Sequence, residues 1–256
     1  MKTFCFTVDD NIRFLKEINE QRPKSIFEHP YLNMYLRLHK KFNLKVQLNL
    51  FFETDGFNLK DMTDAYFDEF KENSNWLKLS FHSRLENVDP YKDSSYDEVL
   101  FDCKRVNEQI IRFATKEALA KTTTIHYCLA TKEGIKAIED CGIKGLLGLY
   151  GTNENPRTSY QIDTLDAEKI RNGYIAKNGK ISYAPIDIVL NDAPPKQIKT
   201  MLDNMKTRKH IWVMIHEQYF HPDYHRHIEN YEELLENTFT HLTENGFSSC
   251  FFEELL

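Results

Sequence analysis

The chain has 256 residues, 41% hydrophobic content and a formal net charge of −6. This length suits one large α/β domain or two small ones, and the apolar content suffices for a substantial core. The acidic balance and the lack of a Lys/Arg run argue against a nucleic-acid partner. No apolar run reaches the roughly 18 residues of a membrane span, so we expect no membrane partner.

Cysteine usage and the first residues bear on the location of the protein. The five cysteines are an odd number and form no Cys-x-x-Cys pair, so we expect them to be reduced, small apolar residues. The sequence enters its first strand by Thr3 without a secretory signal. We therefore expect a cytoplasmic protein.

Apolar strands and amphipathic helices alternate along the chain. Residues 4–10 predict a buried strand that runs into two adjacent carboxylates, Asp9 and Asp10. Further strands are expected at 44–52, 76–82, 122–127, 143–149, 186–190, 211–215 and 248–252, and helices at 12–20, 31–41, 61–73, 96–120, 131–141, 194–205 and 231–244. A hairpin is expected around Asn178-Gly179.

This alternation predicts the fold class. Several strands are apolar on both faces, as parallel strands covered by helices must be. About seven to eight strand–helix units without a break in composition predict a single, distorted (β/α) barrel that spans residues 1–256. The sequence has no Gly-x-Gly-x-x-Gly or phosphate-loop signature, which disfavours a nucleotide-binding fold.

Three of the apolar strands stop at residues that bind metals or transfer protons. These residues are Asp9 with Asp10, His82 and His216. Because strand ends meet on one face of an α/β sheet or barrel, we expect all four side chains to meet there. If Asp10 and His82 lay more than about 8 Å apart, they could not share one metal ion, since ligand atoms lie near 2.0–2.2 Å from it.

Each candidate also has an ordinary structural interpretation. One of Asp9 and Asp10 can bind a divalent cation while the other accepts a proton from water, but Asp is also common just before a helix. His82 and Glu86 are four residues apart, so on a helical turn they would share one face and one metal ion. The alternative is an ordinary histidine and a solvated glutamate.

The other histidines are less specific signals. His216 could donate a proton to a leaving group or could be a core histidine that binds a backbone carbonyl. His126 ends the 122–125 run and could orient a substrate, stabilise an oxyanion or be structural. His221, His225 and His227 resemble a metal-binding tract only by composition, and we expect them in a surface loop.

The order of these residues resembles the motifs of the polysaccharide deacetylase-like carbohydrate esterases. That family's Thr-Phe-Asp-Asp motif corresponds to residues 7–10, which implies that Asp9 is the base and Asp10 a metal ligand. Its His-Ser/Thr-x-x-His motif corresponds to residues 82–86, with Glu86 in place of the second metal-binding histidine. Its Leu-x-His motif corresponds to residues 214–216, which implies that His216 is the general acid.

The sequence departs from the family at two further places. Asn11 stands where a glycine is usual, and the Arg-Pro-Tyr motif that would fall near residues 125–127 is missing. That arginine is expected to orient the base, and His126 is the residue that could replace it. These departures point to a divergent branch of the deacetylase-like barrels.

The resemblance implies a metal-dependent hydrolase that removes an N- or O-acetyl group from a saccharide or saccharide conjugate. Asp10, His82 and Glu86 would hold a divalent ion, with zinc expected ahead of nickel, cobalt or manganese. The partner would be a saccharide or small acetylated substrate. Its expected contacts, beside the catalytic Asp9 and His216, are His126, Tyr127, Glu217 and Tyr219.

Two other functions are open at this point. A barrel glycosidase would need a carboxylate pair roughly 5 to 9.5 Å apart, for which Asp9 with Asp187 or Glu217 is the available choice. A catalytically inactive barrel could instead bind a saccharide without hydrolysing it. A metal between the strand ends would favour the deacetylase.

Overall fold

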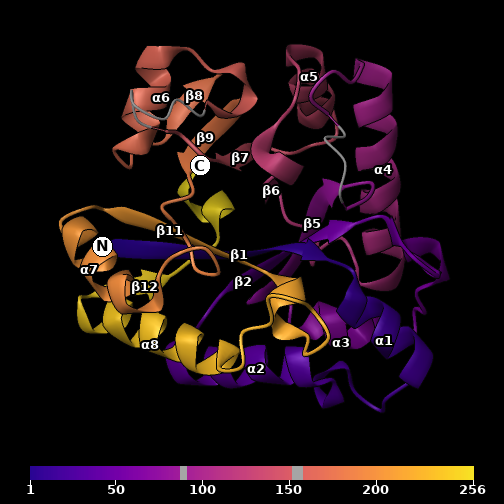
Figure 1. Ribbon diagram of the computed structural model, residues 1–256. Helices are drawn as coiled ribbons and strands as arrows, with labels where there is room; N and C mark the ends of the chain where they lie inside the picture. Colours follow the sequence, from indigo (N-terminus) through magenta and orange to yellow (C-terminus); the bar gives the residue numbers. More distant parts are fainter. Residues whose placement is uncertain (87–90, 152–157) are drawn as a thin grey trace.

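A parallel sheet forms the centre of the protein, which is described here by a computed structural model covering residues 1–86, 91–151 and 158–256. The strand order is β10-β11-β1-β2-β5, and β12 also pairs with β1 (Figure 1). The strands are β1 (Lys2–Asn11), β2 (Val46–Phe51), β5 (Leu77–Ser83), β10 (Ile188–Val189), β11 (His210–His216) and β12 (Phe247–Ser249).

A second sheet has the order β6-β7-β9-β8. Its strands are β6 (Thr122–Thr123), β7 (Gly145–Gly148), β8 (Ala176–Asn178) and β9 (Ile181–Pro185). The strands β6, β7 and β9 are parallel, whereas β8 pairs antiparallel with β9 and forms the expected hairpin around Asn178-Gly179. A small separate hairpin joins β3 (Glu53–Thr54) and β4 (Phe57–Asn58).

Helices cover the central sheet and link the two sheets (Figure 1). Helices α2 and α8 pack together on one side of the central sheet, and α4 packs against β5 and α5. No helix among the described residues is long and apolar enough to cross a membrane. The helices are α1 (Arg13–Gln21), α2 (Pro30–Phe42), α3 (Phe67–Glu72), α4 (Tyr96–Phe113), α5 (Lys132–Asp140), α6 (Thr164–Arg171), α7 (Pro195–Met205) and α8 (Tyr231–Glu244).

The predicted α/β fold with mostly parallel strands is confirmed, but the described strands do not form one closed sheet. On one side, β5 meets residues 118–120 through two backbone hydrogen bonds at Leu79 and then contacts β6. On the other side, the Ile186 N–H donates to the Gly148 carbonyl and the next N–H, of Asp187, donates to the Trp212 carbonyl. The two sheets are therefore joined by single contacts where a closed barrel would have continuous ladders.

Several predicted strands are shorter than expected, most clearly those near residues 122 and 248. The strand expected at 122–127 ends at Thr123 and continues into a 3₁₀ helix, η3 (His126–Cys128). Tyr127 and Cys128 both have positive φ values, 58° and 56°, which no continuous strand allows. The last strand ends at Ser249, and residues Phe252–Leu255 form another 3₁₀ helix.

The two faces of β1 have different environments, although both are buried. Phe4 and Phe6 pack against Phe239 of α8. Residues of a strand alternate between faces, so Asp9 lies on the opposite face, which is turned towards the second sheet. In β2, Gln47 and Asn49 alternate with apolar residues and therefore share one face of the strand. Both are buried rather than solvated.

Asn11 shapes the end of β1. Its Nδ2 donates to the carbonyl oxygens of Val8 (2.6 Å), Asp9 (3.2 Å) and Asn49 (3.3 Å), and its Oδ1 accepts from the Tyr31 hydroxyl (2.7 Å). The preceding residue, Asp10, has a left-handed φ of 62°. The register between β1 and β2 also shifts here. The buried amide of Asn11 thus fixes the turn that carries Asp9 and Asp10.

We predict that Asn11→Ala lowers the free energy of unfolding by about 2 to 4 kcal/mol, because leaving a buried polar group unpaired costs roughly 1 to 3 kcal/mol. Tyr31→Phe removes a single one of these bonds and is expected to cost about 1 to 2 kcal/mol. Urea unfolding followed by circular dichroism measures both. A wild-type stability in Asn11→Ala would show that the amide does not hold the turn.

Candidate metal centre

A cavity of about 360 Å³ lies at the carboxyl ends of β1, β5 and β11. It contains all four strand-end residues that were expected to meet, Asp9, Asp10, His82 and His216. The other lining residues are Glu86, Thr124, His126, Tyr127, Cys128, Leu149, Val189, Asn191, Asp192, Met214, Gln218, Tyr219, Tyr224 and Arg226.

Asp10, His82 and His126 form a tight triangle at the bottom of this cavity. Oδ1 of Asp10 lies 3.0 Å from Nε2 of His82 and 3.2 Å from Nδ1 of His126. The two histidine nitrogens are 3.1 Å apart. Within the described ranges, this is the group of His, Cys, Asp and Glu side chains whose ligand atoms lie close enough to hold one metal ion.

The hydrogen bonds of His82 fix which of its nitrogens carries the proton. Nδ1 lies 2.5 Å from the carbonyl oxygen of Thr124, which can only accept, so Nδ1 carries the proton. Burial lowers the pKa of His82 and so favours the neutral ring, although its contact with Asp10 opposes this. Its Nε2 lone pair therefore points at the Asp10 carboxylate, an unfavourable arrangement unless a cation lies between them.

The triangle fits a divalent cation by donor type and spacing. Ligand atoms about 2.0 to 2.1 Å from one tetrahedral ion lie roughly 3.3 Å apart, close to the observed separations. The bond from His82 to Thr124 is also the kind of outer contact that orients metal-binding histidines. Nε2 of His126 is buried and has no hydrogen-bond partner among the described residues.

Asp10 is held as a charged carboxylate. Burial raises its pKa, but the adjacent His126 and His82 side chains outweigh burial and hold the pKa well below its usual range. Its second oxygen, Oδ2, accepts a hydrogen bond of 2.8 Å from Nε2 of Gln218. One oxygen of Asp10 thus faces the histidines, and the other is fixed by Gln218.

Asp9 lies beside the triangle and is only 2% exposed. Burial raises its pKa well above the usual value, and a 2.6 Å hydrogen bond from Asn49 Nδ2 partly opposes this. Gln47 donates to Asn49 Oδ1 (2.8 Å) and to the Thr122 carbonyl (2.9 Å), so the Asn49 amide is held in one orientation. The sequence left open whether His126 takes the place of the missing arginine, and in the structure Asn49 lies against Asp9.

His216 presents one nitrogen to the cavity. Its Nδ1 donates to Oδ1 of Asn191 at 2.8 Å, since an amide oxygen can only accept. Its Nε2 lies 4.0 Å from Oδ2 of Asp10. Burial lowers the pKa of His216, and the neighbouring Asp10 charge acts in the opposite direction. Because Nδ1 is held by Asn191, Nε2 is the nitrogen that would meet a group bound in the cavity.

The third residue beside Asp10 and His82 is His126 and not Glu86. Glu86 lines the cavity but is exposed and lies outside the triangle. Its predicted position assumed a helical turn, but β5 ends at Ser83 and residues 84–86 are not helical, so a spacing of four does not align it with His82. The third side chain of the triangle is His126, which we had considered for substrate contact, oxyanion stabilisation, a structural role or the place of the missing arginine, but not as a metal ligand.

The remaining predicted contacts divide into two groups. Tyr127, with 42% of its surface exposed, and Tyr219 line the cavity as expected. Glu217 is buried outside the cavity, where its carboxylate accepts backbone hydrogen bonds from the start of α1. Its neighbour Gln218 faces the cavity in its place. His221 is also buried rather than part of a surface loop.

The carboxylate pairs considered for a glycosidase are not available. Asp187 binds Nη1 of Arg208 at 2.5 Å and the backbone N–H of Trp212 at 3.0 Å, and it does not line the cavity. Glu217 is likewise engaged elsewhere. Neither can face Asp9 across a bound sugar.

Sequence signals for the missed residues were weak. Asn49 and Gln47 alternate with Val46, Leu48 and Leu50, a pattern typical of a strand with one solvated face. In the structure that face is not solvated, because the second sheet covers it and Gln47 binds the Thr122 carbonyl. Asn191, Tyr224 and Arg226 come from loops whose sequence carries no motif.

No family model and no curated protein matches this chain. Solved structures do match it over 99% of its length. They include a 4-α-glucanotransferase from Thermococcus litoralis (TM-score 0.63, 15% identity), of which the chain spans 40%. They also include a family 4 acetyl xylan esterase from Clostridium thermocellum in complex with cobalt (0.55, 13%, 90% of that chain). A third is a pseudoenzyme of carbohydrate esterase family 4 from Bacillus anthracis (0.53, 15%, 65% of that chain).

These likenesses cover nearly the whole chain but rest on low sequence identity, so they bear on the fold alone. The esterase and the pseudoenzyme share one fold, and they differ in whether that fold supports catalysis. The chain has a polysaccharide deacetylase-like α/β fold.

Proposed function

We propose that this protein is a divalent-metal-dependent hydrolase that removes an acetyl group from a saccharide or saccharide conjugate. The observation that carries the proposal is the triangle of Asp10, His82 and His126, in which a neutral histidine lone pair faces a carboxylate. The shared fold with an acetyl xylan esterase that binds cobalt supports the same reading. The two carboxylates considered as partners of Asp9, Asp187 and Glu217, are engaged outside the cavity, which argues against the glycosidase.

The residues of the triangle would hold the ion. When bound, a divalent ion polarises an acetyl carbonyl and lowers the pKa of a water molecule from 15.7 towards about 7. Asp9, a buried carboxylate fixed by Asn49, accepts the proton of the attacking water. His216 then donates a proton from Nε2 to the leaving amine or alkoxide, while Asn191 holds its other nitrogen.

The cavity indicates the size of the substrate. Ligand pockets typically measure about 300 to 1,000 Å³, so a volume of about 360 Å³ fits a short saccharide. Tyr127 and Tyr219 offer flat aromatic faces against which a sugar ring can pack. We infer that zinc is the resident ion, since two histidines and one carboxylate are common zinc ligands.

The first prediction concerns the ligand set. We expect the wild type to bind about one zinc or cobalt ion per chain, and Asp10→Ala, His82→Ala and His126→Ala each to weaken binding by at least about 100-fold, because outer-shell changes alone cost about 10- to 100-fold. Glu86→Gln is the matched control and should bind within about threefold of wild type. Elemental analysis and competitive titration with a chelating dye measure these affinities.

Two outcomes would change this assignment. A loss of metal in Glu86→Gln, with retention in His126→Ala, would restore the ligand set expected from the sequence, namely Asp10, His82 and Glu86. A wild type that binds no metal even with excess cation would exclude the proposed hydrolase.

The second prediction separates the roles of Asp9 and His216. Asp9→Asn should lower the rate of acetate release from every substrate by about 10²- to 10⁴-fold, because it removes the base. His216→Ala should lower the rate by a similar factor for N-acetyl sugars but far less for 4-nitrophenyl acetate, whose leaving group departs without a proton.

Both variants should retain the metal, which elemental analysis checks. Equal losses for the two substrate types in His216→Ala would contradict its role as general acid. Saccharide binding by a metal-loaded wild type that releases no acetate would identify an inactive binding barrel instead.

A further inference from the structure

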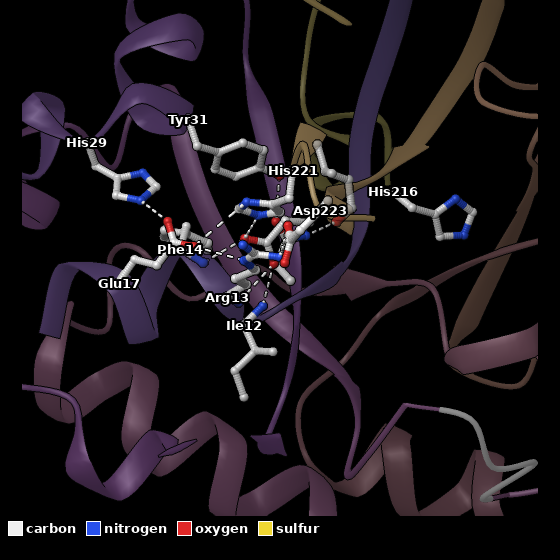
Figure 2. A network of polar contacts seen from close by, with 12 residues as sticks. Ile12, Arg13, Phe14, Glu17, His29, Tyr31, His216, His221 and Asp223 are labelled. Atoms are coloured by element: carbon white, nitrogen blue, oxygen red, sulfur yellow. Dashed lines mark hydrogen bonds and ion pairs between the residues drawn. The ribbon is translucent and has the colours of Figure 1, made fainter. Parts of the chain in front are cut away.

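A polar network behind the cavity links the two chain segments that carry the proposed base and acid (Figure 2). The parallel ladder between β1 and β11 ends at the pair Asp9 and His216. Beyond this pair, side chains continue the connection. Gln218 donates to Asp10 on the cavity side, and Glu217 binds the start of α1 on the opposite side.

The carboxylate of Glu217 accepts three backbone hydrogen bonds. Its Oε2 accepts from the N–H groups of Ile12 (2.7 Å) and Arg13 (3.0 Å), and its Oε1 accepts from that of Phe14 (2.6 Å). The N-cap residue Ile12 provides no side-chain cap of its own. Helix N-termini leave such groups unpaired and favour negative charge, so Glu217 caps α1 from a distant part of the sequence.

Glu217 has few other partners. It is 1% exposed, and no lysine or arginine of the described chain forms an ion pair with it. His221 Nε2 lies 3.5 Å from its Oε1, and His221 Nδ1 lies 3.8 Å from Glu17. Glu17 in turn binds Arg13 and His29, each at 2.8 Å. This network rigidly encloses the carboxylate and leaves it no access to the cavity.

We propose that Glu217 is a positioning residue, which sets the placement of Asp10 relative to His216 and Gln218. The inference rests on the proposed function of this site. Asp10 lies two residues before the capped N–H of Ile12, in a left-handed turn where the β-ladder no longer holds it. His216 and Gln218 flank Glu217 directly. A displacement of the helix start from Glu217 would therefore separate Asp10 from both.

Glu217→Gln tests this role in the full-length protein. The substitution replaces one carboxylate oxygen by an NH₂ group, which can only donate. That NH₂ group would face a backbone N–H, which also donates, so at least one of the three hydrogen bonds is lost. We expect zinc affinity to fall about 10- to 100-fold, as for other residues that orient metal ligands. At saturating zinc we expect a lower kcat with little change in KM, because Glu217 does not line the cavity.

Two controls separate positioning from simple destabilisation. Asp163→Asn makes the same carboxylate-to-amide change at the N-cap of α6, outside the cavity. Leu242→Ala removes a buried side chain of α8 and lowers the melting temperature without touching the cavity. Both should bind zinc within about threefold of wild type.

Each outcome bears on the proposal in a defined way. If Glu217→Gln melts at a lower temperature but keeps wild-type zinc affinity and kcat, Glu217 is only a helix cap and the proposal is wrong. If the wild type binds zinc but releases no acetate, the proposed activity fails while the zinc titration still tests Glu217.

If the wild type binds no metal, amide NMR spectra replace the titration. Glu217→Gln should then shift the signals of both Asp10 and Gln218, whereas Asp163→Asn should shift neither. Unchanged Asp10 and Gln218 signals would overturn the proposal.

Discussion

The candidate site depends on three lone-pair donors that face one another where solvent is largely excluded. Asp10 is 7% exposed, and His82 and His126 are buried. In such surroundings an ionised carboxylate is costly to keep without a neighbouring positive charge. The structure nevertheless holds two of the three side chains in place, His82 through Thr124 and Asp10 through Gln218 and the turn at Asn11. Side chains that bind a cation are held in fixed orientations by such contacts.

The same principle explains why the interior between the two sheets is polar. Gln47, Asn49 and Thr122 form a chain of amide and hydroxyl groups that ends on Asp9. Each member has a partner, so the row can be buried without large unpaired losses. A fully apolar strand at this position would pack equally well but would leave Asp9 without a donor. The buried polar residues of β2 therefore help to hold Asp9 in place as well as filling the core.

The fold and the strand-end residues could be predicted from sequence because both depend on local patterns. Apolar runs that stop at Asp9-Asp10, His82 and His216 are visible in one dimension, and parallel strands bring their ends together. The approach of Asp10 and His82 to 3.0 Å agrees with that expectation. The placement of Glu86 could not be predicted, since it depended on whether the chain after His82 is helical or irregular.

The role of Glu217 was hidden for a related reason. An acidic residue directly after a strand-end histidine predicts a side chain in the site, but β11 ends at His216 and a 3₁₀ helix (Glu217–Phe220) begins at the next residue. His216 and Gln218 line the cavity, whereas Glu217 faces α1. The unpaired N–H groups at a helix start can be identified in sequence only when the cap is local, and here it lies about two hundred residues away along the chain.

The exchange of Glu86 for His126 also alters the charge of the site. A ligand set of Asp10, His82 and Glu86 carries two negative charges and would neutralise a divalent ion. The set of Asp10, His82 and His126 carries one, so a complex with a divalent ion would keep a net positive charge with which to polarise a carbonyl and acidify water. Glu86 remains at the exposed side of the cavity, where its charge is screened by solvent. With His126 as the third ligand, a bound divalent ion would therefore keep more of its Lewis acidity than with Glu86.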